Sequence, residues 1–220
     1  MQFQSGQIYH IFNQGNKRQK IFFKRENYLF FLKKLRQFVL PYCDILAWCL
    51  MPNHFHLMVL VNKVQLSLQD RSELPRQVVR SRSATPSRTP TANQPLAKEN
   101  LNKSIGIMLS SYTRAIQKQE NFTGSLFRQK TKAECVTCFN GLTPSFIVKD
   151  GITQNNRLTP EKQYPQVLFN YIHLNPLKAG LVKHVLDWEF SSAKDYFGLR
   201  DGTLINKDIA KQIVDIRLFE

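Results

Sequence analysis

The 220-residue sequence predicts an α+β domain in which an antiparallel sheet carries its helices on one face. Apolar segments of strand character alternate with two amphipathic helical segments in the order β-α-β-β-α-β. That order is typical of the split βαβ, or ferredoxin-like, arrangement, and a C-terminal helix that bears a tyrosine follows it. With 42% hydrophobic and 11% aromatic residues, the chain has enough apolar material for one such core.

The domain begins with a predicted strand and helix. The segment QIYHIFNQ, residues 7–14, has strand character and is followed by the loop GNKRQK. From Tyr28 to Val39, apolar residues then recur at intervals of three and four, which is the stripe of an amphipathic helix. We expect this helix to end before Pro41, because proline cannot continue it.

A hairpin of two apolar strands is predicted next. The run LAWCLMPNHFHLMVLV indicates strands near residues 45–50 and 54–61, joined by a Met-Pro-Asn turn. Both faces of the second strand are apolar beyond its two histidines. A strand that is apolar on both faces is buried on both, so we expect it to be central in the sheet.

The composition changes over residues 64–99, which are rich in Pro, Ser, Thr and Arg and poor in aromatic residues. Such a segment cannot bury enough apolar surface to offset its ordering entropy, so we predict a mobile, basic surface insertion. A second amphipathic helix follows from Leu101 to Ile116, and the segment NFTGSLFRQKTKAECVTC then predicts a basic turn that enters another strand.

The C-terminal third of the chain is less regular. Residues 139–160 are predicted to form an irregular insertion, and a third helix is expected over about 161–175, stopped by Pro176. The prediction is therefore a single domain over residues 1–200, interrupted by the two insertions, with a polar tail at 201–220.

Positive charge dominates the composition. The chain has 31 Lys and Arg against 16 Asp and Glu, a formal net charge of +15. This excess predicts attraction to the phosphates of a nucleic acid, although a basic protein kept soluble by its charge and one that lies on an anionic membrane remain alternatives. The charges recur among aromatic residues, which favours an extended nucleic-acid surface. The residues expected to contact phosphate are Lys17, Arg18, Arg128, Lys130 and Lys132.

The cysteines and the hydropathy indicate the compartment. Cys135 and Cys138 form a CxxC, but no second CxxC or histidine pair stands at zinc-site spacing. We expect these two residues, with Cys43 and Cys49, to be reduced thiols, and structural zinc is the alternative. With no long apolar run and no signal-peptide pattern, the sequence predicts a cytoplasmic protein without a membrane segment.

Two histidines stand at the start of the second hairpin strand. Alternate residues of a strand point to the same face, so His54 and His56 project side by side while Phe55 points the other way. The pair is therefore able to chelate one divalent cation. The alternative is that one histidine caps the turn and the other is a hydrogen-bonded core residue.

The third helix carries a complementary pair. Tyr171 and Asn175 are four residues apart and share a helix face. Together with a metal at the histidines, they supply the parts of a DNA-nicking site: a phenol that attacks phosphorus and, in Asn175, a third metal ligand. Tyr112 is the other candidate nucleophile on a helix, but it falls on the apolar stripe of that helix, so we expect it in the core.

The remaining histidines have weaker patterns. His10 on the first strand is able to neighbour the site, but a lone histidine is more often structural. His173 lies between Tyr171 and Asn175 and should point away from both, and His184 has no evident partner.

Several segments, taken in this order, resemble the single-tyrosine HUH transposases of the insertion-sequence-200 type, and especially the REP-associated tyrosine transposases. His54-Phe55-His56 within MPNHFHLMV matches the histidine–hydrophobic–histidine motif, and YIHLNP from Tyr171 matches the tyrosine motif. GSLFRQKTK resembles a Gly-x-Leu-Trp segment with Phe127 in place of Trp. WEFSSAKDY resembles a Trp-x-x-Ser-Ser segment, and the likeness covers most of residues 7–196 apart from the insertions.

The resemblance implies a single-stranded DNA endonuclease and strand transferase that uses Mg²⁺ or Mn²⁺ and acts on DNA hairpins. In that family, the tyrosine forms a 5′-phosphotyrosine and releases a 3′-OH, which preserves the bond energy without ATP. A phenol has a reference pKa of about 10, so it needs a metal or nearby cations to attack at neutral pH. Some members are homodimers and others monomers, and the insertions leave that choice open for this chain.

Two other functions fit parts of the sequence. One is a DNA-hairpin-binding module without turnover, derived from such a transposase; retention of His54, His56, Tyr171 and Asn175 favours the enzyme, because a pure binder needs none of them. The other is an RNA-binding ferredoxin-like domain. The strands lack the aromatic pattern of such domains, which argues against this function.

Overall fold

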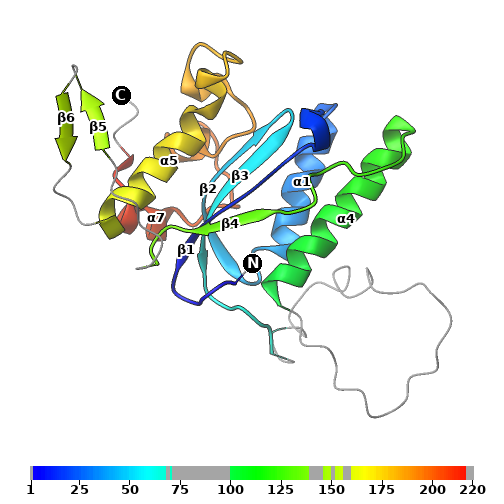
Figure 1. Cartoon of the computed structure of the whole chain (residues 1–220), viewed down its shortest axis with the longest axis horizontal. Coiled ribbons are helices and arrows are strands. Elements are labelled where there is room, and N and C mark those ends of the chain that lie inside the picture. Colours follow the sequence, from blue (N-terminus) through cyan, green and yellow to red (C-terminus); the bar gives the residue numbers. More distant parts are fainter. Residues whose placement is uncertain are drawn as a thin grey trace.

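The computed structural model describes residues 2–67, 70, 100–138, 146–149, 152–155 and 160–216, and Figure 1 gives the view of the whole chain. Its centre is a sheet made of β1 (Ile8–Gln14), β2 (Cys43–Met51), β3 (His54–Val61) and β4 (Lys132–Cys135). The strand order is β2-β3-β1-β4, and every neighbouring pair is antiparallel. The predicted ferredoxin-like α+β arrangement is confirmed, with β3 in a central position.

Two helices cover one face of this sheet. They are α1 (Arg25–Phe38) and α4 (Leu101–Glu120), which lie side by side in Figure 1. Their apolar stripes meet the same face of the strands, so that Phe31 is fully buried with its ring centroid 5.1 Å from that of Phe55 and 5.0 Å from that of Tyr112. The helix bounds follow the sequence signals, since α1 ends before Pro41 and the side chain of Asn100 caps the start of α4.

The helix α5 (Pro160–Lys178) lies on the opposite side of the sheet (Figure 1). Leu168, Phe169 and Ile172 form a second core there with Cys49 and Met58 of the hairpin strands. The sheet is thus buried on both faces, which explains why β2 and β3 are apolar almost throughout.

Pro176 does not stop α5, contrary to the prediction from the sequence. The helix continues through it because the amide of Ala179 donates to the carbonyl of Asn175 at 3.0 Å. The end comes at Gly180, which has a φ of 68° and completes a Schellman motif in which the amide of Leu181 donates to Pro176. The last turn holds Asn175 in helical geometry beside the sheet.

The outer edge of β2 is covered by residues 188–192, which follow the short helix η4 (Val185–Asp187). The amide of Leu50 donates to the carbonyl of Phe190, and the amide of Ser192 donates to that of Trp48, both at 2.9 Å. Trp188 Nε1 donates to the Leu50 carbonyl at 3.1 Å. These contacts satisfy backbone groups that an open edge strand would expose.

The predicted polar tail at residues 201–220 is wrong as far as residue 216. After α6 (Ala193–Tyr196), the chain forms α7 (Lys207–Ile213). Ala210 and Val214 are buried in the same core as α5, because the few apolar residues of this segment fall on one helix face.

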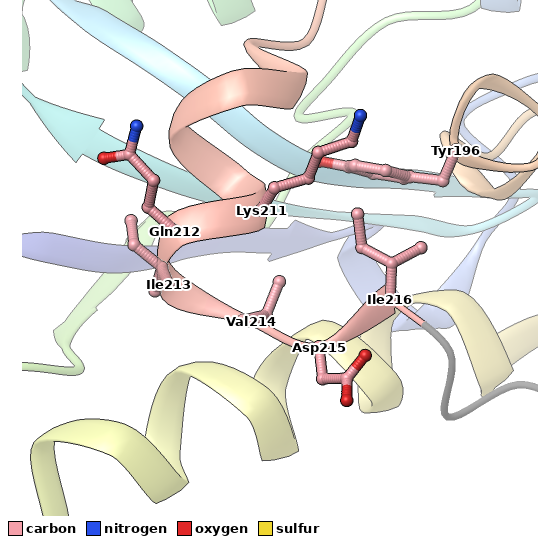
Figure 2. Close-up of a pocket in the computed structure, with 7 residues that line it drawn as sticks. All are labelled: Tyr196, Lys211, Gln212, Ile213, Val214, Asp215 and Ile216. Carbon is pink, nitrogen blue, oxygen red and sulfur yellow. The ribbon is translucent and has the colours of Figure 1, made fainter.

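A pocket lies beside this segment (Figure 2). Its lining residues are Tyr196, Lys211, Gln212, Ile213, Val214, Asp215 and Ile216.

The predicted insertions fall mostly outside the described residues. The first leaves and re-enters the domain at one place, since the amide of Leu101 donates to the carbonyl of Val64 at 3.0 Å and Gln65 forms a β-bridge with Asn100. In the second, the prediction of irregular structure is wrong for β5 (Phe146–Lys149) and β6 (Ile152–Asn155), which form a separate two-stranded antiparallel sheet.

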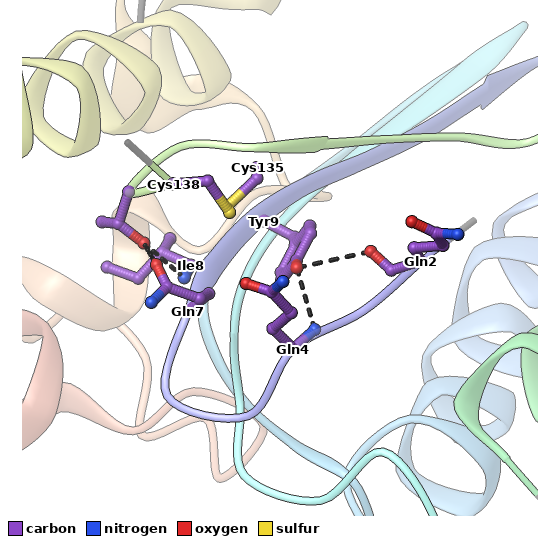
Figure 3. Close-up of a disulfide and its surroundings, with 8 residues drawn as sticks. Gln2, Gln4, Gln7, Ile8, Tyr9, Cys135 and Cys138 are labelled. Atoms are coloured by element: carbon purple, nitrogen blue, oxygen red, sulfur yellow. Dashed lines mark hydrogen bonds between the residues drawn. A yellow bond between two sulfur atoms is a disulfide. The ribbon is translucent and has the colours of Figure 1, made fainter. Parts of the chain in front are cut away.

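The expectation of four reduced thiols is also wrong. Cys135 at the end of β4 forms a disulfide with Cys138 (Figure 3). Spacing alone could not distinguish this pair from free thiols, because a CxxC suits either state. Cys43 and Cys49 are free and buried in β2, as the strand pattern indicates. Among the helices of the described residues, none is long and apolar enough to span a membrane.

Candidate functional site

The histidine pair occupies the face of β3 that looks toward α5. The strand alternates: Phe55 and Leu57 belong to the core under α1 and α4, whereas Met58 belongs to the core under α5. His54 and His56 share the parity of Met58, so both imidazoles lie on the α5 side. Their ring centroids are 4.9 Å apart. The side-by-side arrangement predicted from the His-x-His spacing is confirmed.

The strand β1 brings a second row of side chains to the same face. In the antiparallel register, Phe12 lies opposite His56 and Gln14 lies opposite His54. The next residue of that row, His10, reaches across to His56, and its Nε2 lies 2.9 Å from His56 Nδ1. Sequence reasoning left His10 as a neighbour at most, because the register between β1 and β3 cannot be read from either strand alone.

Tyr171 and Asn175 come to the histidines from α5. The Tyr171 ring meets the His56 ring edge to face, with centroids 5.2 Å apart, and it is 40% exposed to solvent. One turn further along α5, Asn175 Oδ1 lies 3.4 Å from His54 Nε2. The side chains proposed from sequence as nucleophile and metal ligands are therefore brought to one place from two distant segments.

His54 Nε2 and Asn175 Oδ1 face each other as two hydrogen-bond acceptors. Asn53 Nδ2 donates to the Arg18 carbonyl at 3.4 Å, so the Asn53 amide presents its oxygen to His54 Nδ1, 2.6 Å away. The proton of neutral His54 then sits on Nδ1, and Nε2 is unprotonated. Its neighbour is Asn175 Oδ1, which is also an acceptor, and a cation between the two atoms would satisfy both.

His56 presents an unpartnered nitrogen at the same place. The residue is 5% exposed, and its Nε2 is a buried polar atom without a hydrogen-bond partner in the described part of the chain. Such atoms are uncommon and often mark a ligand or ion site. His54 Nε2, His56 Nε2 and Asn175 Oδ1 thus form a donor set suited to a divalent cation. Within the described residues, no group of three or more His, Cys, Asp or Glu side chains is placed to hold a metal, so this site depends on the amide.

Burial keeps these imidazoles neutral. It lowers the pKa of His56 to about 2, with a smaller effect from the neighbouring His10 and His54, and it lowers the pKa of His10 to about 4. Burial also lowers the pKa of His54, although its contact with Asn175 opposes the shift. Neutral imidazole is the form that binds metal, so the site is in its ligating form at neutral pH.

A basic pocket opens beside the histidines. It has a volume of about 260 Å³, and Arg128, Lys130 and Lys132 line it together with His54, His56 and Tyr171. Arg128 is positioned by Asn13 on β1, whose Nδ2 donates to the Arg128 carbonyl at 3.2 Å and to Thr131 Oγ1 at 2.9 Å. The three cations are exposed, which suits binding of an anion from solvent.

Lys17 and Arg18 do not line this pocket. They belong to η1 (Asn16–Arg18), which is held against the β2–β3 turn by the amide of Gly15 donating to the Asn53 carbonyl at 2.8 Å. Only glycine fits position 15, because a Cβ there would meet the Gln19 carbonyl oxygen at 2.0 Å. The loop thus holds the exposed residues Lys17 and Arg18 beside the turn that precedes His54.

The residues set aside on sequence grounds lie elsewhere. Tyr112 is fully buried and its hydroxyl donates to the Ile21 carbonyl at 2.7 Å, which confirms its place in the core. His173 is also fully buried, and its Nε2 lies 2.7 Å from Ser192 Oγ, away from Tyr171. His184 caps η4 by accepting from the Leu186 amide at 3.2 Å.

The fold and the site together define a class: a ferredoxin-like α+β domain with a histidine pair on a central strand facing a tyrosine on a separate helix. Among solved structures, the chain is similar to a REP-associated tyrosine transposase bound to a REP hairpin. The identity is 17% and the TM-score 0.48, over 100% of this chain and 94% of that chain. No family model and no curated protein matches the chain.

Proposed function

We propose that this protein cleaves and rejoins single-stranded DNA next to a hairpin, with Tyr171 as the nucleophile. The observation that carries the proposal is the contact between Tyr171 and His56. A half-exposed phenol stands against a buried imidazole whose Nε2 has no hydrogen-bond partner among the described residues. Arg128, Lys130 and Lys132 line the same pocket, and their positive charge suits the negative charge of a phosphodiester.

In the proposed reaction, the Tyr171 oxygen attacks the scissile phosphorus. The new Tyr171 O–P bond forms as the bond between phosphorus and the 3′-oxygen breaks, and the phenol proton ends on the departing 3′-oxygen. The products are a 5′-phosphotyrosine and a free 3′-OH. Attack of another 3′-OH on the adduct reverses these bond changes, restores the phenol and joins the strands, so no external energy source is needed.

His54, His56 and Asn175 would hold a divalent metal, Mg²⁺ or Mn²⁺, through the three unprotonated atoms described above. Bound there, the metal supplies Lewis-acid stabilisation of the negative charge that develops on the phosphate. The chain's own contribution is positioning: β3 fixes the imidazoles, α5 fixes the phenol, and the basic pocket orients the DNA backbone.

The substrate class rests on charge, access and the sequence motifs. A net charge of +15 and the cluster Arg128, Lys130 and Lys132 favour a polyanion. Tyr171 is 40% exposed and lines a pocket of about 260 Å³, and a single strand reaches such a side chain more readily than a duplex does. The motifs around His54 and Tyr171 resemble those of transposases that act at DNA hairpins. We therefore propose a hairpin with a single-stranded flank as the substrate.

The test is a cleavage assay on end-labelled hairpin DNA with single-stranded flanks, with and without Mn²⁺. Denaturing gels are read for a covalent protein–DNA band. We expect a metal-dependent band from the wild type and none from Tyr171→Phe. Tyr112→Phe is the matched control: it removes the hydroxyl of a buried tyrosine, and the band should persist.

Two results would overturn the proposal. A band that survives in Tyr171→Phe moves the nucleophile to another residue. Hairpin binding without any covalent band, across several flank sequences and both metals, favours a DNA-binding protein without turnover.

A further inference from the structure

We propose that His10 is a positioning residue that fixes the tautomer of His56 and so keeps His56 Nε2 unprotonated for the metal. The inference rests on the proposed function, because it concerns a ligand of the proposed metal. It assigns a role to a residue on a different strand from the histidine motif.

His10 and His56 are in direct contact, and neighbouring groups hold His10 in place. His10 Nε2 lies 2.9 Å from His56 Nδ1, and the two rings stack with centroids 5.0 Å apart at an interplanar angle of 25°. The Phe12 ring also stacks on the His10 ring, with centroids 4.4 Å apart. The position of His10 is thus fixed by its strand, by its aromatic neighbour and by His56.

A single proton is shared between His10 Nε2 and His56 Nδ1. If His10 Nε2 carried it, His56 would accept at Nδ1 and would hold its own proton on Nε2. That proton would be a buried N–H without an acceptor among the described residues, and it would block metal binding. If His56 Nδ1 carries the proton, His10 accepts it and the lone pair of His56 Nε2 is free. Buried orphaned N–H groups are rarer than under-satisfied acceptors, which favours this second arrangement.

The other proposed imidazole ligand is arranged in the same way. His54 Nδ1 lies 2.6 Å from Asn53 Oδ1, which leaves His54 Nε2 as the unprotonated atom, facing Asn175 Oδ1. Each histidine therefore has its Nδ1 held by a partner and its Nε2 available to the site. Partners of this kind orient metal-bound imidazoles and fix which nitrogen binds. Asn53 has this role for His54, and His10 has it for His56.

The first test uses the metal-free protein. A long-range ¹H–¹⁵N correlation spectrum distinguishes the two tautomers of each histidine. We expect His56 as the Nδ1–H tautomer in the wild type and in His10→Gln, whose amide oxygen is able to accept the proton. In His10→Phe, which keeps a ring and loses the acceptor, we expect the Nε2–H tautomer to appear. A wild-type His56 protonated on Nε2 would overturn the inference without any variant.

The second test measures Mn²⁺ affinity from the electron paramagnetic resonance signal of the free ion. Loss of an outer partner of a metal ligand typically lowers affinity about 10–100-fold, and we expect a loss in that range for His10→Phe. His10→Gln should recover most of it, and His184→Gln, a change at an exposed histidine outside the site, should bind as the wild type does. Equal affinity in His10→Phe and the wild type would overturn the inference.

The two proposals fail in different ways. If the wild type forms the DNA adduct and binds Mn²⁺, but neither the His56 tautomer nor the affinity depends on residue 10, only the role of His10 falls. If the wild type forms no adduct, the proposed function falls, while the tautomer of metal-free His56 still reports on His10.

Discussion

Tyr171 on α5 and His56 on β3 lie with their ring centroids 5.2 Å apart, edge to face, across the boundary between the helix and the sheet. The two residues belong to segments far apart in the chain. Their contact depends on α5 packing against the face of the sheet opposite to α1 and α4. The proposed cleavage chemistry requires that contact, because it brings the phenol to the proposed metal ligands.

Asn175 is predicted to be a metal ligand through its side-chain oxygen. In Asn175→Leu that donor is lost, and we expect Mn²⁺ affinity to fall by at least the roughly 10-fold typical of a lost metal-site partner. Asn175→Asp places a charged oxygen at the same position and should bind Mn²⁺ at least as tightly as the wild type, because the ion favours carboxylates. Titration followed by electron paramagnetic resonance measures both, and unchanged affinity in Asn175→Leu would remove Asn175 from the ligand set.

The basic pocket is predicted to contact the DNA backbone. For single strands, the slope of log affinity against log salt changes by about 0.7 for each phosphate contact, so replacing Arg128, Lys130 and Lys132 by alanine should reduce it by about 2. The matched control replaces Lys103, Arg114 and Lys118 by alanine. These cations lie on α4, on the other face of the sheet, and their loss changes the net charge equally. Fluorescence anisotropy over a salt series gives the slopes, and equal slopes for both triple variants would contradict the proposed binding face.

Buried His173 is predicted to make stability fall in mild acid. Burial lowers its pKa to about 3, whereas the unfolded chain has the ordinary value of about 6.5. A histidine with a depressed folded pKa contributes stability that is present above pH 6.5 and is lost as the pH falls toward 3. The loss from one such group approaches about 1.4 kcal/mol per pH unit. Urea unfolding of the metal-free protein at pH 7 and pH 5 measures this effect, to which His10 and His56 add.

The variant His173→Gln isolates the contribution of His173 to this change in stability with pH. In His173→Gln the change in unfolding free energy between pH 7 and pH 5 should be smaller than in the wild type. An equal pH dependence in His173→Gln and the wild type would mean that His173 is not held neutral in the folded state.

Residues 71–99 are predicted to be dispensable for folding. The chain on either side is joined by the bond from the Leu101 amide to the Val64 carbonyl, and Asp70 accepts from the Ser67 amide at 2.9 Å. Replacing 71–99 with a short Gly-Ser linker should therefore leave the thermal unfolding midpoint nearly unchanged, because closing a shorter loop costs less entropy. We expect DNA affinity to fall modestly, since the deleted segment is basic. Loss of cooperative unfolding would contradict the prediction.

Much of the fold could be predicted because its signals are local. The predicted bounds of β3, residues 54–61, match the structure because a continuous apolar run follows a Pro-Asn turn. The apolar stripes of α1 and α4 indicate both helices and the burial of Tyr112. The side-by-side placement of His54 and His56 follows from strand alternation alone.

Other features depend on contacts between distant segments. The pairing of His10 with His56 requires the β1–β3 register, and neither strand encodes that register by itself. The helix α5 continues through Pro176 and ends one turn later in a Schellman motif, which the proline alone does not predict. The helix α7 was missed because it is short and mostly polar, and only its packing beside α5 reveals that Ala210 is a core residue.

The most direct test of the proposed chemistry is to identify the residue that carries the DNA. The wild-type protein is incubated with hairpin DNA and Mn²⁺, the covalent product is digested with nuclease and protease, and the nucleotide-bearing peptide is sequenced by mass spectrometry. We predict a nucleotide joined through its 5′-phosphate to the oxygen of Tyr171. A nucleotide on any other residue, or attachment through a 3′-phosphate, would contradict the proposed mechanism.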